Sequence, residues 1–518
     1  MMQDNPLTIP EQFRQAIELY ADETVIYGLD QEVSFAQLDH DSEQFAAVLN
    51  QQGIRQGDRI GLYCINCAQF VVSYLGILKA GAIVVPVNLL IRPDEISYIL
   101  NNAEVTALVY HDLMAESVDA CRQRVSSIQL FVPIQASAIR KGELDYETMI
   151  AGERDLPGID LGADDIAAIL YTSGTTGQPK GAVLSHRNLV SNTFSVAAAL
   201  DLRPRQDRLL VVLPMFHSFA ATVGMLTPLL HGLSLIPVPK FEPALVSDAI
   251  DRHQATLFLG VPSMYGVILR LAEDRLDQWK SIRFGVSGGA AMPVELMHQF
   301  EQRFQFPILE GDGPTECSPV TSVNPLNGVR KTASVGLPVP DVEIGIFDDA
   351  GNRIATDEIG EICVRGPNVM QGYWGLPDET RESFFQDWFR TGDLGYLDED
   401  GYIFMVDRKK DMIIVNGMNV YPRMVEEVLY KHPEIAEAAV VGEPHATHGE
   451  TVVAHVVLEE GSELTASEIK SWSSEQLGQH QRPRKIVMRS ALPKNATGKI
   501  LKRELRKTGE IERGIDSR

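Results

Sequence analysis

The sequence predicts an α/β fold joined to an α+β fold, and three observations support this class. Over the first 330 residues, short apolar runs alternate with amphipathic stretches, as in strand–helix–strand units around a largely parallel sheet. Between about 335 and 405 the pattern changes to short strands separated by DDAGN and DEDG, which predicts a small antiparallel, β-barrel-like region. After DRKKD at 407–411, helix and strand patterns resume. We therefore expect a large N-terminal domain of strand–helix layers over 1–406, a hinge linker at 407–411 and a small mobile C-terminal domain over 412–518.

Each expected element follows from its residue pattern. Apolar runs of strand length and amphipathic stretches of helix length alternate along the chain. In the large domain the expected strands are 59–64, 82–87, 106–111, 208–214, 233–239, 255–260 and 283–289, with helices that include 68–80 and 93–102. In the small domain we expect helices over 420–432 and 465–477 and strands over 435–443 and 450–460.

The segment YTSGTTGQPKG at 171–181 contains three glycines, five hydroxyl side chains and one lysine. Such a loop can surround a compact anion with backbone N–H and hydroxyl donors, and a polyphosphate is the usual ligand. It is not the nucleotide loop of kinases and ATPases, because Pro179 occupies the second glycine position and an apolar strand at 182–184 follows the lysine. We expect a hairpin loop after the strand 166–172, with Ser185 as the N-cap of a helix over 186–200.

Charge and composition exclude several classes of protein. The formal net charge of −24 disfavours a nucleic-acid partner. The N-terminus lacks the basic start and apolar core of a signal peptide, and the apolar stretches at 75–91 and 223–238 are better explained as buried helix–strand units than as membrane spans. The five cysteines form no disulfide framework, and for CINC at 64–67 a metal or redox role is disfavoured. We expect a cytoplasmic protein, with peripheral membrane contact and a homodimer left open.

Seven short motifs occur in order along nearly the whole chain. They are the loop at 171–181, PMFHSFA at 214–220, SGGA at 287–290, DGPTE at 312–316, TGDLG at 391–395, DRKKDMI at 407–413 and PKNATGKI at 493–500. With these motifs the chain resembles the adenylate-forming superfamily of acyl-CoA synthetases, peptide-synthetase adenylation domains and luciferases. It looks nearest to the bacterial fatty-acid–CoA ligases.

The resemblance implies an ATP-dependent activation of a carboxylic acid to an acyl-adenylate and then to acyl-CoA, with release of AMP and pyrophosphate. Two anions must approach each other in the first step, so cations are the catalysts. The resemblance places Lys499 between the carboxylate and the α-phosphate, Glu316 on Mg²⁺, and His217 beside the reacting carboxylate and the thiol channel. With Thr172, these are the expected catalytic residues, and the implied cofactors are ATP, Mg²⁺ and coenzyme A.

The resemblance also implies residues for each subsite. The expected nucleotide-binding residues are Thr172, Ser173, Gly174, Thr175, Thr176, Gly177, Lys180, Gly288, Gly289, Ala290, Glu310, Gly311, Asp312, Gly313, Thr315, Asp393, Arg408 and Lys499. The expected hinge residues are Asp407 and Lys410. The CoA channel would contain His217, Gly417, Met418 and Asn419, and the acid pocket Phe216, His217, Val261, Tyr265, Gly288 and Gly289.

Three positions depart from the family pattern. Asp312 replaces the tyrosine that most often stacks on adenine, so a carboxylate acceptor for the adenine amine could take its place and nucleotide affinity is in question. Met424 replaces a common glutamate and His445 a common aspartate, so the docking contacts of the small domain are expected to differ.

The acid substrate follows from the strings LPMFHSFAATVGM, GVPSMYG and VSGGAAM, which are apolar and small. They contain no arginine for a second carboxylate and no aspartate for an amino group. An apolar monocarboxylic acid, with a medium- or long-chain fatty acid as the best fit, is therefore expected. Aryl acids such as benzoate or coumarate remain an alternative, as do transfer to a carrier protein and a catalytically inactive nucleotide-binding relative.

Overall fold

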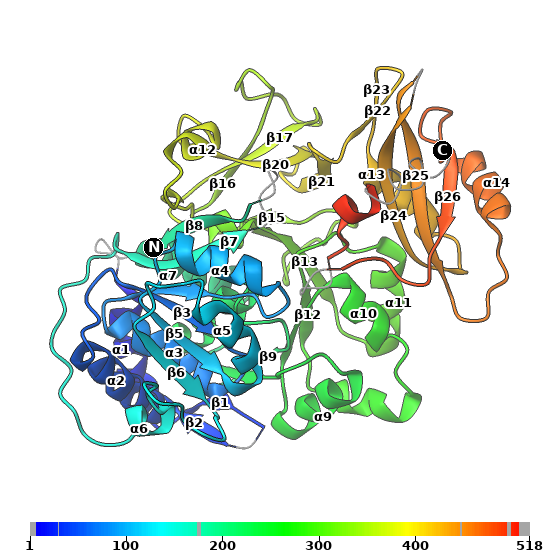
Figure 1. The fold of residues 1–518 in the computed structure, drawn as a ribbon. Coiled ribbons are helices and arrows are strands. Elements are labelled where there is room, and N and C mark those ends of the chain that lie inside the picture. Colours follow the sequence, from blue (N-terminus) through cyan, green and yellow to red (C-terminus); the bar gives the residue numbers. More distant parts are fainter. Residues whose placement is uncertain (1–6, 30, 173–177, 446–447, 495–498, 507–518) are drawn as a thin grey trace.

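The computed structural model describes residues 7–29, 31–172, 178–445, 448–494 and 499–506. Figure 1 shows a large unit built around two sheets, a third sheet above them, and a small unit formed by the C-terminal part of the chain. The predicted combination of a large α/β domain with a smaller α+β domain is confirmed. The predicted boundaries of the domains and of the linker stay a prediction.

The first sheet has seven strands in the order β18-β8-β7-β4-β3-β5-β6. Its strands are β3 (Arg59–Tyr63), β4 (Ile83–Pro86), β5 (Ala107–His111), β6 (Leu130–Ile134), β7 (Ile166–Thr172), β8 (Lys180–Ser185) and β18 (Gly372–Tyr373). The five strands from β3 to β7 pair in parallel, whereas β8 is antiparallel to both β7 and β18. The predicted hairpin around the phosphate loop is therefore present, and Ser185 caps helix α7 (His186–Ala199) as predicted.

The second sheet has nine strands in the order β15-β14-β13-β12-β11-β9-β10-β1-β2. They are β1 (Thr24–Tyr27), β2 (Glu32–Ser34), β9 (Arg208–Val211), β10 (Ser234–Pro237), β11 (Leu257–Gly260), β12 (Phe284–Ser287), β13 (Ile308–Asp312), β14 (Ser322–Val323) and β15 (Leu337–Pro338). From β1 to β13 the pairing along the sheet is parallel. The carboxyl ends of β9, β12 and β13 therefore meet at one edge, where parallel sheets usually bind their ligands.

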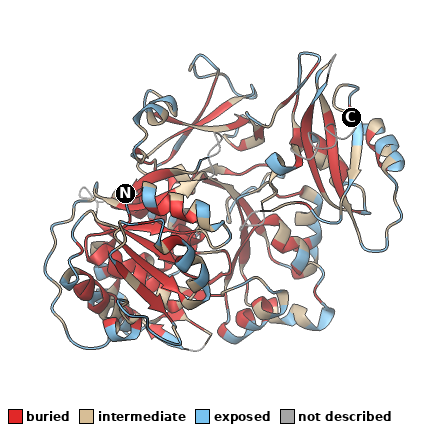
Figure 2. Cartoon of the chain, in the orientation of Figure 1, coloured by how far each residue is buried: buried red, intermediate tan, exposed pale blue. Residues whose placement is uncertain are grey.

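A shared helix layer lies between these two sheets. It contains α1 (Ile9–Tyr20), α2 (Phe35–Gln51), α3 (Ala68–Lys79), α7, the π-helix η2 (Ala220–Leu226) and α8 (Thr227–His231). Eleven of the twelve residues of α3 are buried, which explains why its sequence is apolar on every face. Figure 2 shows the buried residues concentrated in the strands and in these inner helices.

The outer faces carry helices that are half exposed. Sheet one is covered by α4 (Pro93–Asn102), η1 (Asp112–Met114) and α5 (Ala115–Arg122), and short α6 (Tyr146–Ile150) packs on α2. α9 (Pro243–His253), α10 (Pro262–Ile268), η3 (Glu273–Trp279) and α11 (Val294–Phe304) belong to the second sheet, and η4 (Thr315–Cys317) follows β13. Between the second sheet and these helices, the Phe258 ring lies 5.3 Å from the rings of both Trp279 and Tyr265, and the Tyr265 ring lies 5.0 Å from that of Phe300.

The third sheet is antiparallel and contains β16 (Glu343–Phe347), β17 (Gly360–Arg365), β19 (Phe384–Phe385), β20 (Trp388–Leu397) and β21 (Ile403–Arg408), with α12 (Pro377–Glu382) beside it. The small unit contains β22 (Ile413–Val415), β23 (Met418–Val420), α13 (Pro422–Tyr430), β24 (Ile435–His445), β25 (Gly449–Leu458), α14 (Ala466–Gln476) and β26 (Lys485–Met488). In the part of the chain that the structure describes, no helix has the length and apolarity needed to cross a membrane.

Candidate active site

The phosphate-loop hairpin and the segment after β13 meet through three side chains. Thr172 and Lys180 pair at the open end of β7 and β8. The Thr172 hydroxyl lies 3.4 Å from Glu316 Oε1, and the hydroxyl of Tyr373 donates to the same oxygen at 2.9 Å. The Lys180 ammonium lies 5.3 Å from the centre of the Tyr373 ring. The predicted residues Ser173, Gly174, Thr175, Thr176 and Gly177 lie outside the described residues.

Tyr373 is a site residue that the sequence interpretation missed. It belongs to β18, which reaches the phosphate-loop hairpin by pairing Gly372 with Val183 and Tyr373 with Ala182. That pairing joins segments almost two hundred residues apart, so no local pattern could reveal it. The available signal was a short aromatic run after a glycine, which is too weak to identify a site residue.

Glu316, the residue expected to hold Mg²⁺, carries a carboxylate beside Thr172 and Tyr373. It lies in η4, half-buried, with two hydroxyl donors directed at its Oε1 atom. The described residues contain no cluster of three or more metal-ligating side chains. A single carboxylate fits Mg²⁺, because this ion usually binds through one or two carboxylates together with phosphate oxygens and water.

Asp393 and Arg408 form the second charged group of the site. Strands β20 and β21 pair these two residues directly, and Arg408 Nε donates to Asp393 Oδ1 at 3.0 Å. Asp393 is 5% exposed, so the ion pair fixes its carboxylate at the position where the sequence interpretation expects the ribose. The predicted pair is therefore assembled in the structure.

Asp312 and Lys499 lie close enough to Asp393 and Arg408 for the charges of this pair to shift their pKa values. Burial and the nearby Asp393 carboxylate raise the pKa of Asp312 to about 6. Burial and the Arg408 guanidinium lower the pKa of Lys499 to about 8, whereas the Asp393 and Asp312 carboxylates oppose this shift. A lysine from the C-terminal part of the chain thus lies at the predicted nucleotide site, which is the arrangement needed to stabilise negative charge there.

His217 lies on the loop after β9 and is uncharged at neutral pH. Burial, with a smaller effect of Lys499, lowers its pKa to about 4. Its Nδ1 atom accepts a hydrogen bond from the Phe219 N–H at 3.4 Å, so the ring proton belongs on Nε2. The neighbouring Ser218 hydroxyl lies 3.1 Å from the Thr315 hydroxyl and links this loop to the DGPTE segment. His217 can therefore donate a hydrogen bond through Nε2, and its low pKa disfavours a role as a general base.

A cavity opens beside these groups. His217, Asp312, Gly288, Gly289, Gly311 and Gly313 line one part of it, and apolar side chains line most of the remainder. The apolar lining consists of Val196, Leu200, Phe219, Val223, Val286, Pro319, Val320 and Val323. Among the described residues that line the cavity, Asp312 is the only Asp, Glu, Lys or Arg.

Three predicted acid-pocket residues do not line this cavity. Phe216, Val261 and Tyr265 are all buried. The Tyr265 hydroxyl donates to the carbonyl oxygens of Phe258 and Val286, at 3.3 and 3.0 Å, which makes it a support beneath two strands. Sequence reasoning placed these residues by motif proximity. It did not connect the pocket with Val196 of α7 and Leu200 at the C-cap of that helix, which both line the cavity.

Glu310, another expected nucleotide-binding residue, does not line the cavity. Its side chain is 2% exposed and accepts a hydrogen bond from the Met292 N–H at 2.9 Å, whereas its Oε2 atom has no hydrogen-bond partner among the described residues. Burial raises the pKa of Glu310 to about 7, and the Arg423 guanidinium acts in the opposite direction. Glu310 therefore holds the loop after Ala290 through its hydrogen bond with the Met292 N–H.

The remaining predicted positions lie in the small unit and at its connection. Asp407 is buried in β21 and accepts from the N–H groups of Arg408 and Arg423, whereas Lys410 is exposed in the turn before β22. Asn416 and Gly417 form the hairpin turn between β22 and β23, with φ values of 52° and 79°. Figure 1 shows this hairpin at the end of the small unit away from β12 and β13. The structure thus does not bring Gly417, Met418 and Asn419 to His217.

The fold and the site define an adenylate-forming enzyme, and comparisons with known proteins agree. The model of the AMP-binding enzyme family matches residues 13–374, and the model of the AMP-binding enzyme C-terminal domain matches residues 424–499. The chain belongs to this family, and its class is that of the AMP-forming acyl-CoA ligases.

Similar proteins include ligases for different acids. A long-chain-fatty-acid–CoA ligase of Bacillus subtilis is 36% identical over 94% of this chain and 92% of its own length. A feruloyl-CoA synthase of an Amycolatopsis species is 34% identical over 92% of this chain and 94% of its own length.

A solved structure provides a comparison in two states. MatB from Rhodopseudomonas palustris is 31% identical, and the match covers 97% of this chain and 99% of MatB. The TM-score is 0.89 against its ATP-bound structure and 0.77 against its apo structure. The arrangement of this chain is therefore nearer to the ATP-bound form of that protein.

Proposed function

We propose that this protein activates a medium- or long-chain fatty acid with ATP to an acyl-adenylate and then transfers the acyl group to coenzyme A. The observation that carries the proposal is the cavity beside His217 and Asp312, whose lining is mostly apolar and otherwise contains glycines and three serines. Transfer of an aliphatic chain from water into a cavity with such a lining would be favourable.

The charged end of the cavity supports the first half-reaction. A carboxylate oxygen of the acid attacks the α-phosphorus of ATP, and the bond from that phosphorus to the bridging oxygen breaks as pyrophosphate leaves. Lys499 would stabilise the negative charge shared by the two reacting groups, and His217 Nε2–H would orient the acid carboxylate. Asp393 would accept from the ribose hydroxyls. Mg²⁺, held by Glu316, would neutralise charge on the phosphates when bound.

In the second half-reaction the sulfur of coenzyme A attacks the acyl carbon, and AMP leaves with the electrons of the carbon–oxygen bond. The hairpin of β22 and β23, which contains 417–419, lies at the end of the small unit away from β12 and β13, whereas Lys499 lies near His217. We propose that a rotation about the 407–411 linker, with Asp407 and Lys410 as hinge residues, exchanges these two faces of the small domain.

An aryl acid is the alternative substrate, because a relative with feruloyl-CoA synthase activity in its name is almost as similar as the fatty-acid ligase. An aromatic ring would also favour the apolar lining. A carrier protein as acyl acceptor is a further alternative. We also propose a cytoplasmic location without a nucleic-acid partner.

A substrate panel tests the proposal. Saturated fatty acids of increasing length, benzoate, coumarate, ferulate and amino acids would be compared by kcat/KM for AMP formation, with and without coenzyme A. We expect fatty acids to be preferred and AMP formation to be stimulated by coenzyme A, with Lys499→Ala as the background control. A preference of more than about tenfold for an aryl or amino acid, roughly 1.4 kcal/mol in transition-state binding, would overturn the fatty-acid assignment.

A further inference from the structure

We propose that Asn66 is a positioning residue that holds the loop 213–217, and through it His217, against the acid-binding cavity. This inference rests on the proposed function only for the identity of the acid. Asn66 lies in the turn between β3 and α3 and is 5% exposed. It thus belongs to the first sheet, whereas the loop that it contacts belongs to the second.

The amide of Asn66 connects the two sheets at four points. Its Nδ2 atom donates to the carbonyl oxygens of Val211, Leu213 and Val238, at 3.0, 2.9 and 3.2 Å. Its Oδ1 atom accepts from the Met215 N–H at 2.8 Å. With two amide hydrogens for three carbonyl oxygens, one hydrogen must be shared, so the side chain uses its full donor capacity.

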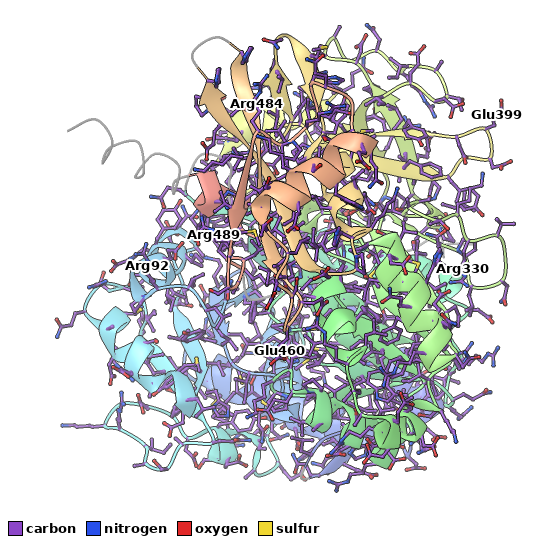
Figure 3. All side chains as sticks on the ribbon, turned by 90° about the vertical axis from the view of Figure 1, so that its right-hand side faces the viewer. Arg92, Arg330, Glu399, Glu460, Arg484 and Arg489 are labelled. Atoms are coloured by element: carbon purple, nitrogen blue, oxygen red, sulfur yellow. The ribbon has the colours of Figure 1, made fainter. Side chains whose placement is uncertain are left out.

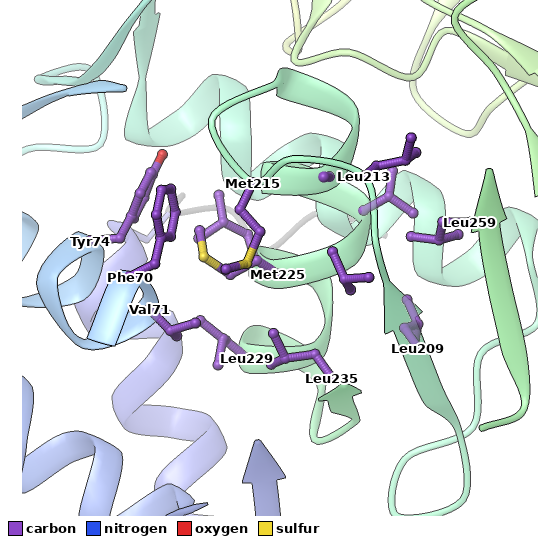
Figure 4. Packing of buried hydrophobic residues seen from close by; sticks show 14 of the residues in the cluster. Phe70, Val71, Tyr74, Leu209, Leu213, Met215, Met225, Leu229, Leu235 and Leu259 are labelled. Carbon is purple, nitrogen blue, oxygen red and sulfur yellow. The ribbon is translucent and has the colours of Figure 1, made fainter. Parts of the chain in front are cut away.

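These contacts fix the backbone that leads to His217. Leu213 and Met215 flank Pro214, whose carbonyl oxygen accepts from the His217 N–H at 2.9 Å. The His217 carbonyl oxygen then accepts from the Ala221 N–H at 2.9 Å, at the start of η2. Figure 4 shows Leu213 and Met215 packed among buried side chains that include Phe70 and Met225. The loop 213–217 is thus held by the packing of its buried side chains and by the Asn66 amide at its start.

The CINC segment has a structural explanation in this arrangement. The Sγ atoms of Cys64 and Cys67 lie 3.6 Å apart and bracket the turn that presents Asn66. An apolar residue at position 66 would leave buried carbonyl and N–H groups without a hydrogen-bond partner. Because unpaired buried polar groups are costly, we expect the loop to move until these groups find other partners. His217 lines the cavity proposed for the acid, so its contribution to acid binding depends on its position. A small displacement of the loop would therefore weaken acid binding more than nucleotide binding.

The kinetic test compares Asn66→Ala with a matched control, Gln44→Ala. Gln44 is also a buried amide, and it holds the Arg154 backbone through a donated and an accepted hydrogen bond. With the acid that the wild-type protein uses best, we expect Asn66→Ala to raise the KM for the acid at least about tenfold while the KM for ATP stays within about twofold. Gln44→Ala should lower the thermal midpoint and change neither KM. In a His217→Ala background, Asn66→Ala should have no further effect on acid use.

A second readout does not depend on turnover. Histidine ring signals of the full chain, with His217 assigned through His217→Ala, would be titrated by NMR. We expect His217 to stay neutral to about pH 5 in the wild-type protein and in Gln44→Ala, and its pKa to rise by about one unit or more in Asn66→Ala as water reaches the loop beside Lys499. If Asn66→Ala does not fold, Asn66→Ser, which keeps one donor and one acceptor, replaces it.

Three results would overturn the inference. They are parallel changes of both KM values in Asn66→Ala and Gln44→Ala, an additive effect with His217→Ala, and an unchanged His217 titration in the Asn66 variant. If no acid of the panel supported AMP formation by the wild-type protein, the proposed function would fail, and the NMR titration would still decide the role of Asn66.

Discussion

At the scale of single residues, two carboxyl groups on β13 stand in different surroundings although only one residue separates them. Asp312 faces the cavity together with the charges of Asp393, Arg408 and Lys499. Glu310 does not line the cavity and accepts a hydrogen bond from the Met292 N–H. Residues two apart share a face of a strand, so alternation does not separate these two carboxylates. They differ because Asp312 ends β13 at the cavity, whereas Glu310 lies inside the strand and is buried.

Replacement of Asp312 is expected to change the pH dependence of ATP use. The pKa of Asp312 is raised to about 6, so its carboxylate becomes negative as the pH rises above that value. Because ATP is itself an anion, we expect the KM for ATP to rise between pH 5 and 8 in the wild-type protein. Asp312→Asn should remove this rise and lower the KM at pH 7.5 about fivefold, roughly 1 kcal/mol.

Pyrophosphate exchange at several pH values measures this effect, with Asp312→Tyr as a second variant that is expected to stay active with an altered KM. A higher KM in Asp312→Asn would contradict the repulsion and would instead indicate a contact from the carboxylate to the adenine amine.

Ionisation of the buried Glu310 carboxyl is expected to lower the free energy of unfolding at alkaline pH. Its pKa is raised from 4.5 to about 7, so its contribution to stability is complete below pH 4.5 and is lost as the pH rises through 7. Glu310→Gln keeps an acceptor for Met292 and removes the buried charge. It should therefore stabilise the protein relative to wild type at pH 8 by at most about 3 kcal/mol and have little effect at pH 5.

Thermal midpoints at pH 5 and 8 provide the measurement, and Glu18→Gln, at an exposed position of α1, serves as the control. Equal midpoint changes at both pH values would show that Glu310 does not titrate in this range.

At the scale of elements, the site depends on a close approach between the turn after β13 and the segment that follows η4. A Cβ atom on Gly313 would lie 1.6 Å from the carbonyl oxygen of Pro319, so no other residue fits without a movement of the backbone. Thr315 and Glu316 follow directly and would move with it. Glycine is needed here because of this contact.

We therefore expect Gly313→Ala to lower the thermal midpoint and to reduce kcat/KM for adenylation at least about tenfold, or roughly 1.4 kcal/mol. Gly158→Ala is the matched control, because a Cβ at that position meets no atom within 4 Å. Pyrophosphate exchange and thermal unfolding of the two variants would be compared. Wild-type kinetics in Gly313→Ala would mean that the turn has room that the structure does not show.

Local patterns predicted the elements well where the decisive interactions are local. The hairpin around 173–177 followed from two apolar runs, and the Ser185 cap followed from its position before the helix. The π-helix over 220–226 and strand β18 were not predicted, because both depend on packing between distant segments. The same limit applies to the site. Asp393 and Arg408 were expected together from motifs, whereas Tyr373, Asn66 and the cavity residues of α7 depend on tertiary contacts.

At the scale of the whole molecule, contacts between the two domains support the orientation in which Lys499 reaches the site. Arg270 of the large domain donates to both carboxylate oxygens of Glu459 at 2.8 Å. Figure 3 shows this end of the small domain, marked by Glu460, in front of the large domain. Such an exposed pair contributes little free energy, about 0–1 kcal/mol, so the orientation can change without a large cost.

The two half-reactions should respond differently to two single substitutions. Lys499→Ala removes a cation that the mechanism needs when pyrophosphate is displaced, so adenylation should fall at least about a hundredfold, roughly 2.7 kcal/mol, while supplied acyl-adenylate still reacts with coenzyme A. Lys410→Pro fixes φ near about −65° in the turn before β22. Among the described backbone contacts, the Lys410 N–H donates no hydrogen bond, so the substitution should restrict rotation without removing a contact.

For Lys410→Pro we therefore expect near-normal adenylation and slower thioester formation, because the protein already lies in the arrangement that resembles ATP-bound MatB. Pyrophosphate exchange measures the first half-reaction, and single-turnover consumption of preformed acyl-adenylate with coenzyme A measures the second. Lys410→Ala, which removes the same side chain without fixing φ, is the control. If both variants lost both half-reactions equally, one fixed arrangement would serve both steps, and the proposed rotation of the small domain would have to be abandoned.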